Sequence, residues 1–428
     1  MRMTSAGVHR GKRRRQLLGP FRYRGYRRYF VGQALSTFGD SLVPLTIAFA
    51  ALQVGGAGAL GLVLAANRVP IAVLVLFGGA LGDRWDRRTV MVGADVLRCG
   101  TQAISGLLLV SGQAELWHLV VLQALAGAGT AVFTPAAAGL VPELVPRSAL
   151  QQANALLGLA TNTNKVVSIS VAGALVAAAG PGVALLVDAA TFATSACSLL
   201  MLRLPVQARE TGRRSLWSEV RAGARLVAAT PWLRAMLAYS ALLQALVIGP
   251  HMVAGPLLAA QLFGGAGAWA TIGVVQAVGS ILGGAVALRW RPRQPLVAAL
   301  AVGVLMVPYL LLFAAGAPLW LVAAAAVAVG AQGALFLAVQ ATLIQRWMPD
   351  DAVSRAAAWS QLGNLVLLPA SLAVAGPVVA EVGGQAVLLV GAAWLVVSTF
   401  VTVASAVRHG PRNEEAPPAA EAGGAAAS

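Results

Sequence analysis

Twelve long apolar runs fill most of the 428-residue chain and limit its fold more than any other feature of the sequence. A helix that spans a bilayer needs about 20 apolar residues, and every run is close to that length or longer. The strands of a membrane barrel take only about 9–11 residues, so these runs do not fit a barrel. The runs cover residues 31–53, 58–81, 89–111, 115–140, 151–178, 183–203, 233–262, 268–289, 295–315, 318–341, 354–380 and 385–407. The sequence therefore predicts an all-α integral membrane protein with twelve transmembrane helices.

The composition supports this prediction and excludes several classes of protein. Charged residues make up 11% of the chain, whereas a soluble protein holds about 25%. The net charge of +16 comes from Lys and Arg residues in short loops, so no nucleic-acid partner is expected. Cys99 and Cys197 lie inside apolar runs and are expected to be free thiols. No hydrolase, metalloprotease or P-loop motif is present in the sequence, so we expect neither an enzyme nor a metal or other cofactor.

The positive charges alternate from loop to loop along the chain. Residues 1–30 hold ten Lys and Arg side chains, and the loop at 204–232 holds five. The alternate loops, near residues 54, 113, 180, 265, 316 and 383, hold none. By the positive-inside rule, both termini are expected in the cytoplasm of a bacterium, with the chain crossing its cytoplasmic membrane many times. The lipid bilayer and a small-molecule substrate are the expected partners of a monomer.

The two halves of the chain repeat each other. A shift of 203 residues places Leu125–Phe133 (LAGAGTAVF) on Ala328–Phe336 (AVGAQGALF), and without a gap it also places Gly173 on Gly376. A parallel repeat of this kind predicts two pseudo-symmetric six-helix halves. The expected parts are a basic cytoplasmic segment at 1–30, the first half at 31–203, a cytoplasmic linker with an amphipathic helix at 204–232, the second half at 233–407 and a disordered tail at 408–428.

A short charged stretch, GGALGDRWDRR at Gly78–Arg88, interrupts the apolar runs. Together with the twelve runs and the repeat, it resembles the loop signature of the major facilitator superfamily. The positions that match this signature are Gly79, Gly82, Asp83, Arg84, Arg87 and Arg88, while Asp86 replaces the usual Gly. Residues 26–40 and 140–156 are similar to a branch of bacterial exporters that includes enterobactin, macrolide and other secretion effectors.

This resemblance implies a secondary active transporter that works by alternating access. The matched loop would help to close the cytoplasmic side between the halves, or it would act only as a hairpin whose arginines fix orientation. The equivalent second-half stretch has Leu288 in place of Asp83, so a closing contact would be one-sided. The main expectation is proton-driven export of a small amphipathic molecule, such as a siderophore, an antibiotic or another drug-like compound. Solute uptake, or a receptor or scaffold that does not transport, are the alternatives.

Ionisable residues inside transmembrane helices are costly and mark functional positions. The candidates for a substrate or proton pathway are Asp40, Arg68, Asn154, Thr161, Lys165, Asp188, His251 and Asn364. Helical spacing places Asn154, Thr161 and Lys165 on one face of the fifth helix, and the repeat maps Thr161 on Asn364. The sequence therefore predicts a central cavity lined by helices 1, 5, 7 and 11.

The roles of these charges allow alternatives. Asp40 is expected to be the carboxylate that couples transport to protons. Lys165 is expected to contact substrate, or to form an ion pair with Asp40 or Asp188. The two positive charges of Lys165 and Arg68 exceed the single negative charge of Asp40. Either Asp188 restores the charge balance, or the cavity suits an anionic substrate. His251 is either a proton carrier or a packed histidine. Asp95 and Arg98, three residues apart, are expected to form a local structural pair.

Overall fold

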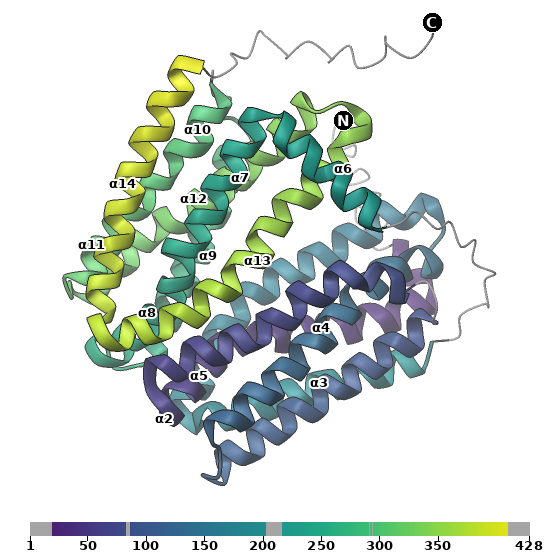
Figure 1. The fold of residues 1–428 in the computed structure, drawn as a ribbon. Helices are drawn as coiled ribbons and strands as arrows, with labels where there is room; N and C mark the ends of the chain where they lie inside the picture. The colour runs from purple at the N-terminus through teal and green to yellow at the C-terminus, as the bar shows by residue number, and fades with distance from the viewer. Residues whose placement is uncertain (1–18, 83–85, 203–215, 291, 293, 410–428) are drawn as a thin grey trace, which may run out of the picture. The chain divides into compact units, whose positions relative to one another are not determined.

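The computed structural model describes residues 19–82, 86–202, 216–290, 292 and 294–409. All of the regular secondary structure in this part of the chain is helical (Figure 1). The contacts between residues divide the chain into two compact units. Unit 1 contains residues 1–54 and 66–211, and unit 2 contains residues 55–65 and 212–428. Residues 55–65 therefore group with unit 2, although they precede the predicted linker in the sequence.

Two long helices of the first half each contain two transmembrane segments. The elements are η1 (Gly19–Arg22), α2 (Arg24–Gly82), α3 (Arg87–Val110), α4 (Leu116–Leu144) and α5 (Arg147–Leu200). Helix α2 is broken at Gly55 and Gly56, and α5 is broken at Gly180, which has a φ of 81°. Gly56 has a φ of 67°, and glycine adopts this left-handed conformation without steric cost. Both breaks lie at predicted loops that carry no positive charge.

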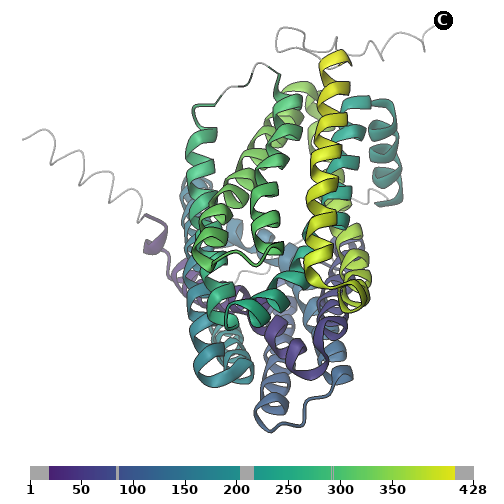
Figure 2. The ribbon, with the colours of Figure 1, turned by 90° about the vertical axis from the view of Figure 1, so that its left-hand side faces the viewer.

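The second half begins after the short helix α6, which lies in the predicted linker. Its elements are α6 (Leu216–Ala229), α7 (Pro231–Leu243), η2 (Gln244–Ile248), α8 (Gly249–Leu262), α9 (Ala266–Ala287), α10 (Pro295–Ala301), η3 (Val302–Met306), α11 (Val307–Ala314), α12 (Leu319–Trp347), α13 (Asp350–Val382) and α14 (Gly384–His409). The π-helical turn η2 precedes Pro250, which has no backbone N–H to continue the α-helical ladder. Helix α14 is continuous in both views (Figures 1 and 2).

These elements make up the twelve predicted transmembrane helices. Helices α2 and α5 supply two segments each, and the runs Pro231–Leu262 and Pro295–Ala314 each form one apolar segment across their irregular turns. Six segments therefore precede α6 and six follow it. The predicted fold class is confirmed.

A cluster of buried side chains joins the helices of unit 1. Tyr26 on α2, Met91 on α3 and Phe133 on α4 pack together with residues of α5. The Tyr26 hydroxyl is fully buried and donates a hydrogen bond to the carbonyl oxygen of Ala153 at 2.8 Å. This bond satisfies the buried phenol and fixes α2 against α5.

The predicted repeat extends to the contacts between helices. Gly127 on α4 maps on Gly330 on α12, and each faces the backbone of a neighbouring helix. A Cβ atom at Gly127 would lie 2.1 Å from the Asn67 carbonyl oxygen, and one at Gly330 would lie 1.8 Å from that of Gln276. Close approach of two helix backbones requires a small residue at the contact, so both halves use the same packing device.

Two equivalent serines make a second repeated contact. Ser168 donates to the Phe38 carbonyl oxygen at 2.9 Å, and its repeat partner Ser371 donates to the Ala245 carbonyl oxygen at 2.5 Å. Each bond joins the fifth helix of a half to the first helix of the same half. The pseudo-symmetry of the two halves therefore includes side-chain contacts as well as helix order.

Gly330→Ala is expected to destabilise the protein by about 1–3 kcal/mol, because the added methyl group would overlap the Gln276 backbone. Thermal unfolding in detergent measures this effect. Gly333→Ala on the same helix is the matched control, since nothing lies within 4 Å of a Cβ atom there. Equal melting temperatures for the two variants would contradict the close contact between α9 and α12.

Candidate functional site

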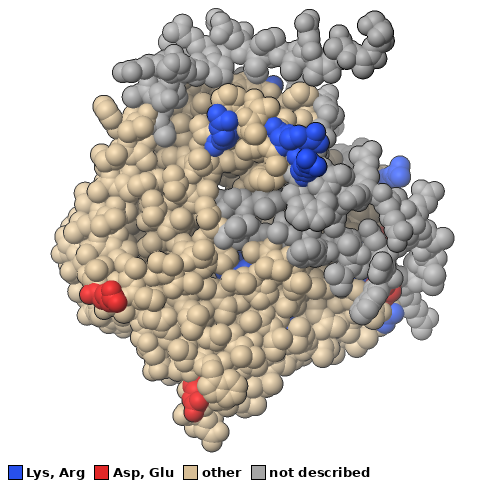
Figure 3. Space-filling view, viewed as in Figure 1, with Lys and Arg blue, Asp and Glu red and all other residues tan. Residues whose placement is uncertain are grey.

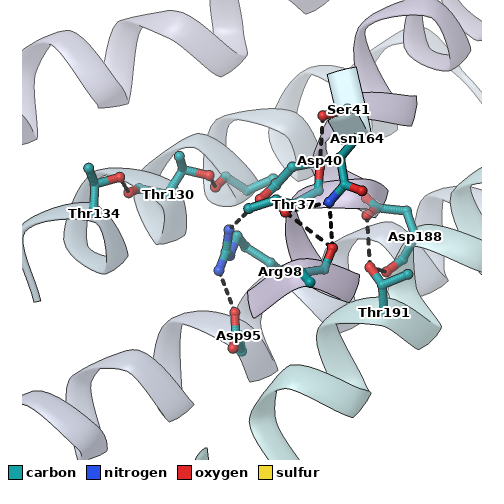
Figure 4. Close-up of polar contacts among 12 residues, drawn as sticks. Thr37, Asp40, Ser41, Asp95, Arg98, Thr130, Thr134, Asn164, Asp188 and Thr191 are labelled. Carbon is teal, nitrogen blue, oxygen red and sulfur yellow. Dashed lines mark hydrogen bonds and ion pairs between the residues drawn. The ribbon is translucent and has the colours of Figure 1, made fainter. Parts of the chain in front are cut away.

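A buried ion-pair network lies within unit 1. The side chain of Arg98 on α3 is 2% exposed and reaches two carboxylates (Figure 4). Its Nη1 lies 3.4 Å from Oδ2 of Asp40 on α2, and its Nη2 donates to Oδ1 of Asp95. Asp95 is fully buried, whereas the side chain of Asp40 is 40% exposed. The guanidinium group therefore joins an enclosed carboxylate to an accessible one.

Two aromatic rings hold Arg98 from its other sides. The guanidinium carbon lies 4.3 Å from the ring centre of Phe133 on α4 and 4.2 Å from that of Phe192 on α5. Cation–π contacts of this kind stabilise a desolvated cation. Side chains from α2, α3, α4 and α5 consequently fix the position of one positive charge.

A third carboxylate, Asp188 on α5, lies against the backbone of α2 beside Asp40. It is fully buried. A Cβ atom at Gly39 would lie only 2.2 Å from Asp188 Oδ1, so the glycine is what allows this approach. The Thr191 hydroxyl lies 3.4 Å from Asp188 Oδ1, and Oδ2 has no hydrogen-bond partner in the described part of the chain (Figure 4). Unit 1 thus gathers three carboxylates around one guanidinium.

The predicted polar face of the fifth helix is oriented by Asn164. Its side-chain amide donates to the Ala34 carbonyl oxygen at 2.7 Å and to Thr37 Oγ1 at 2.8 Å (Figure 4). Lys165, the next residue, is exposed and forms no ion pair with any described residue. Asn154 is exposed and Thr161 is half-buried on the same helix. The structure therefore pairs Asp40 with Arg98 and leaves Lys165 available.

Arg68 on α2 is half-buried and also has no ion pair among the residues that the structure describes. Its neighbour Asn67 donates to the carbonyl and side-chain oxygens of Gln123 on α4, both at 3.3 Å. Gln123 in turn donates to the side chain of Gln102 on α3 at 3.1 Å. This buried chain of amides was not predicted, because Gln and Asn carry no charge that would make them stand out in an apolar run.

His251 lies in an aromatic environment in unit 2. Its Nε2 is 2.8 Å from the hydroxyl oxygen of Tyr309, and the centre of its ring is 5.4 Å from that of Tyr309 and 5.5 Å from that of Trp269. Both His251 and Tyr309 are buried. This geometry favours the packed histidine over the proton carrier. Asn364 lies on α13, but its side chain is outside the described residues.

The charged loop between α2 and α3 is described in part. Gly79 and Gly82 are in the final turns of α2, while Asp83 and Arg84 lie outside the described residues. Asp86 caps α3 by accepting a hydrogen bond from the Thr89 backbone N–H at 3.0 Å. A capping role explains why Asp replaces the Gly of the signature.

The two arginines of this loop hold the ends of neighbouring helices. Arg87 Nη1 lies 2.9 Å from Glu143 Oε1 near the end of α4. Arg88 Nε donates to the Leu199 carbonyl oxygen at 2.9 Å, and Arg28 Nη1 donates to the Met201 carbonyl oxygen at 2.7 Å. Cations at the C-terminal end of a helix satisfy its free carbonyl groups and complement its dipole. Within unit 1, Arg87 and Arg88 therefore have structural contacts, and the predicted gate remains a prediction.

A cavity of about 290 Å³ in unit 2 lies between α9 and α12 and is lined by residues that include Trp290, Arg346 and Trp347. None of the predicted pathway residues lines it. Within the described ranges, no group of three His, Cys, Asp or Glu side chains could hold a metal ion, and Cys99 and Cys197 are free thiols.

Comparisons with known proteins agree with this architecture. The chain is 30% identical over 181 residues to the MFS-type transporter YfiS of Bacillus subtilis. The matched stretch covers 42% of this chain and 42% of that protein. It is 24% identical over 177 residues to macrolide efflux protein A of Streptococcus pyogenes, covering 41% of this chain and 44% of that protein. The chain thus spans less than half the length of these curated relatives in the matched stretches.

Solved structures share the fold across nearly the whole chain. The nucleoside transporter NupG superposes with a TM-score of 0.72 at 14% identity, covering 89% of this chain and 98% of that one. A bacterial homologue of the iron transporter ferroportin superposes with a TM-score of 0.70 at 16% identity, over 89% and 98% of the two chains. The family model for the Major Facilitator Superfamily matches residues 29–315, which is more than half of the chain. The chain therefore belongs to the Major Facilitator Superfamily.

Proposed function

We propose that this chain is a secondary active transporter that exports small amphipathic molecules by alternating access and draws its energy from a proton gradient. The observation that carries this proposal is the network of three carboxylates around Arg98 in unit 1. Its most exposed member is Asp40, whose side chain is 40% exposed, and this is the carboxylate that would exchange a proton with water. Intramembrane acids of this kind mark proton pathways.

The direction and the substrate class rest on similarity. One relative is named a macrolide efflux protein, and this supports export of an antibiotic or another drug-like compound, with siderophores as further candidates. Solute uptake on the same fold is the second candidate function. A receptor or scaffold that binds without transport is the third.

Transport by inside-out vesicles distinguishes these functions. Vesicles that contain the protein are given a panel of macrolides and siderophores, with and without an imposed proton gradient. If the protein is an exporter, the compounds accumulate inside the inside-out vesicles, and a protonophore abolishes this accumulation. Accumulation only in right-side-out vesicles would favour uptake, and binding without flux would favour the receptor. Vesicles with the Asp40→Asn variant serve as the matched control for proton coupling.

We also propose that both termini are cytoplasmic in a bacterial cytoplasmic membrane. Figure 3 supports this orientation for unit 2, because basic side chains gather over the end that carries α6. Arg225 lies on α6, Arg289 is the second residue after α9 and Arg346 is in the last turn of α12, whereas Glu381 lies at the far end of α13. A reporter fused to the C-terminus that is active only in the cytoplasm tests this orientation.

Lys165→Gln is expected to leave the folded protein intact and to weaken binding of an anionic or acceptor-rich substrate by about tenfold, or about 1.4 kcal/mol. Lys165 is exposed and unpaired among the described residues, so the fold does not depend on its charge. Binding titration and thermal unfolding of the same sample measure both effects. Lys165→Arg is the control that keeps the charge. Loss of folded Lys165→Gln protein would instead show that the lysine neutralises a buried carboxylate.

A further inference from the structure

We propose that Asp188 holds a proton that is sealed from water in this structure, and that this proton is exchanged with Asp40 during the transport cycle. This inference deepens the proposed proton coupling and rests on it for its role in transport. It assigns a storage site for the proton that is separate from the accessible carboxylate.

The contacts around Asp188 give an ionised carboxylate little support. The Thr191 hydroxyl has one proton, and it donates that proton to the main-chain carbonyl oxygen of Asp188 at 2.7 Å. Its 3.4 Å contact with Asp188 Oδ1 is therefore a poor donor contact. Gln102 on α3 is a further side-chain donor to Asp188, but Oδ2 has no partner among the described residues. An ionised carboxylate that is fully buried needs several donors or a cation of its own. Asp188 has Gln102 and, weakly, Thr191 as donors, and it forms no ion pair within the described ranges.

The balance of charge leads to the same conclusion. The charged and titratable groups that face Asp188 are Asp40 from α2 and Arg98 and Cys99 from α3, and Asp95 binds the same guanidinium group. Arg98 is the one cation among them, and its two terminal nitrogens contact Asp40 and Asp95. An ionised Asp188 would add a negative charge to a desolvated site that already holds more carboxylates than cations. A proton on Asp188 keeps the excess at one negative charge, from Asp40 and Asp95 against Arg98, instead of two.

The position of Gly39 explains how the proton is sealed and how it is released. The α2 backbone covers Asp188 so closely at Gly39 that a Cβ atom there would lie 2.1 Å from Thr191 Oγ1 and 2.2 Å from Asp188 Oδ1. The next residue is Asp40, whose side chain is 40% exposed. A shift of α2 at this point would therefore connect the sealed acid with the accessible one.

The exchange keeps charge constant in the network. A proton leaves the Asp188 carboxyl group and binds the Asp40 carboxylate, so Asp188 becomes negative and Asp40 becomes neutral. The neutral Asp40 releases Arg98 Nη1, which lies 3.4 Å away in this structure, and Arg98 then neutralises Asp188. The proton and the ion pair thus change places, and no other charge has to enter the site.

Infrared spectroscopy of the purified protein in lipid nanodiscs tests this inference directly. A protonated carboxylic acid has a carbonyl stretching band that is separate from the bands of carboxylates and amides. We expect this band in the unmodified protein at neutral pH and its loss in Asp188→Asn, which is nearly isosteric and keeps the neutral charge. Asp40→Asn is the matched control, and it should retain the band. A band that is unchanged in Asp188→Asn would overturn the proposal.

A second measurement needs no variant. In the unmodified protein transferred to deuterium oxide, a sealed acid should exchange slowly, so the shift of its band should lag behind the exchange of exposed groups. Absence of the band at neutral pH, or its immediate shift, would overturn the inference even if Asp188→Asn failed to fold. Neither measurement uses a transported substrate. If proton-driven export fails, the infrared result for Asp188 is therefore unaffected. If the band is absent but export is intact, only the role of Asp188 is overturned.

Discussion

Arg98→Gln is expected to abolish most of the folded protein, because Asp95 and Asp40 would lose the cation that they share. Breaking a buried ion pair by removing one partner costs about 3–5 kcal/mol, which is a large part of the total stability of about 5–15 kcal/mol of a folded protein. Arg98 is 2% exposed and contacts both carboxylates, so water does not compensate for the loss. The yield of monodisperse protein in size-exclusion chromatography and its thermal unfolding in detergent measure the effect.

The double variant Arg98→Gln with Asp95→Asn should recover much of the stability, since it removes the enclosed carboxylate together with its cation. Arg68→Gln is the control for loss of an intramembrane arginine, because Arg68 forms no ion pair within the described ranges. An Arg98→Gln protein as stable as the unmodified one would show that the network does not hold the helices of unit 1 together.

Asp40→Asn is expected to keep substrate exchange and to lose accumulation driven by a proton gradient, down to the level of passive equilibration. Asn has nearly the shape of Asp but cannot carry a proton, and Asp40 is the exposed member of the network. Counterflow of labelled substrate measures exchange, and uptake by inside-out vesicles under an imposed gradient measures coupling.

Asp86→Asn is the matched control for this variant. It makes the same chemical change at the N-cap of α3, where an Asn side chain caps as well as Asp, and it should transport normally. Full accumulation by Asp40→Asn would remove Asp40 from the proton pathway.

The sequence was sufficient to predict the helices and their order. The bilayer sets the length of an apolar span, and the alternation of loop charges fixes which spans follow each other across the membrane. The breaks at Gly56 and Gly180 fall at predicted loops because turns of this kind need a left-handed residue. The same shift of 203 residues that relates the two halves also relates the contacts of Gly127 and Gly330.

The partners of the buried charges could not be predicted in the same way. Spacing along one helix indicates which residues share a face, and it identified the pair Asp95 and Arg98. It does not indicate which face meets a neighbouring helix, so the link from Arg98 to Asp40 was not predicted. The rings of Phe133 and Phe192 that enclose Arg98 come from two other helices, and aromatic residues in an apolar run give no signal of such a role.

The arginines at the end of α5 have a consequence for biosynthesis. Arg28 and Arg88 satisfy carbonyl groups at Met201 and Leu199, and both arginines leave the ribosome before α5 is made. Protein segments that are synthesised first generally fold first. When the sixth span enters the membrane, the donors for its last turn are therefore already in place. The first half of the protein can therefore form the hydrogen bonds at the C-terminal end of α5 while the second half is still being translated.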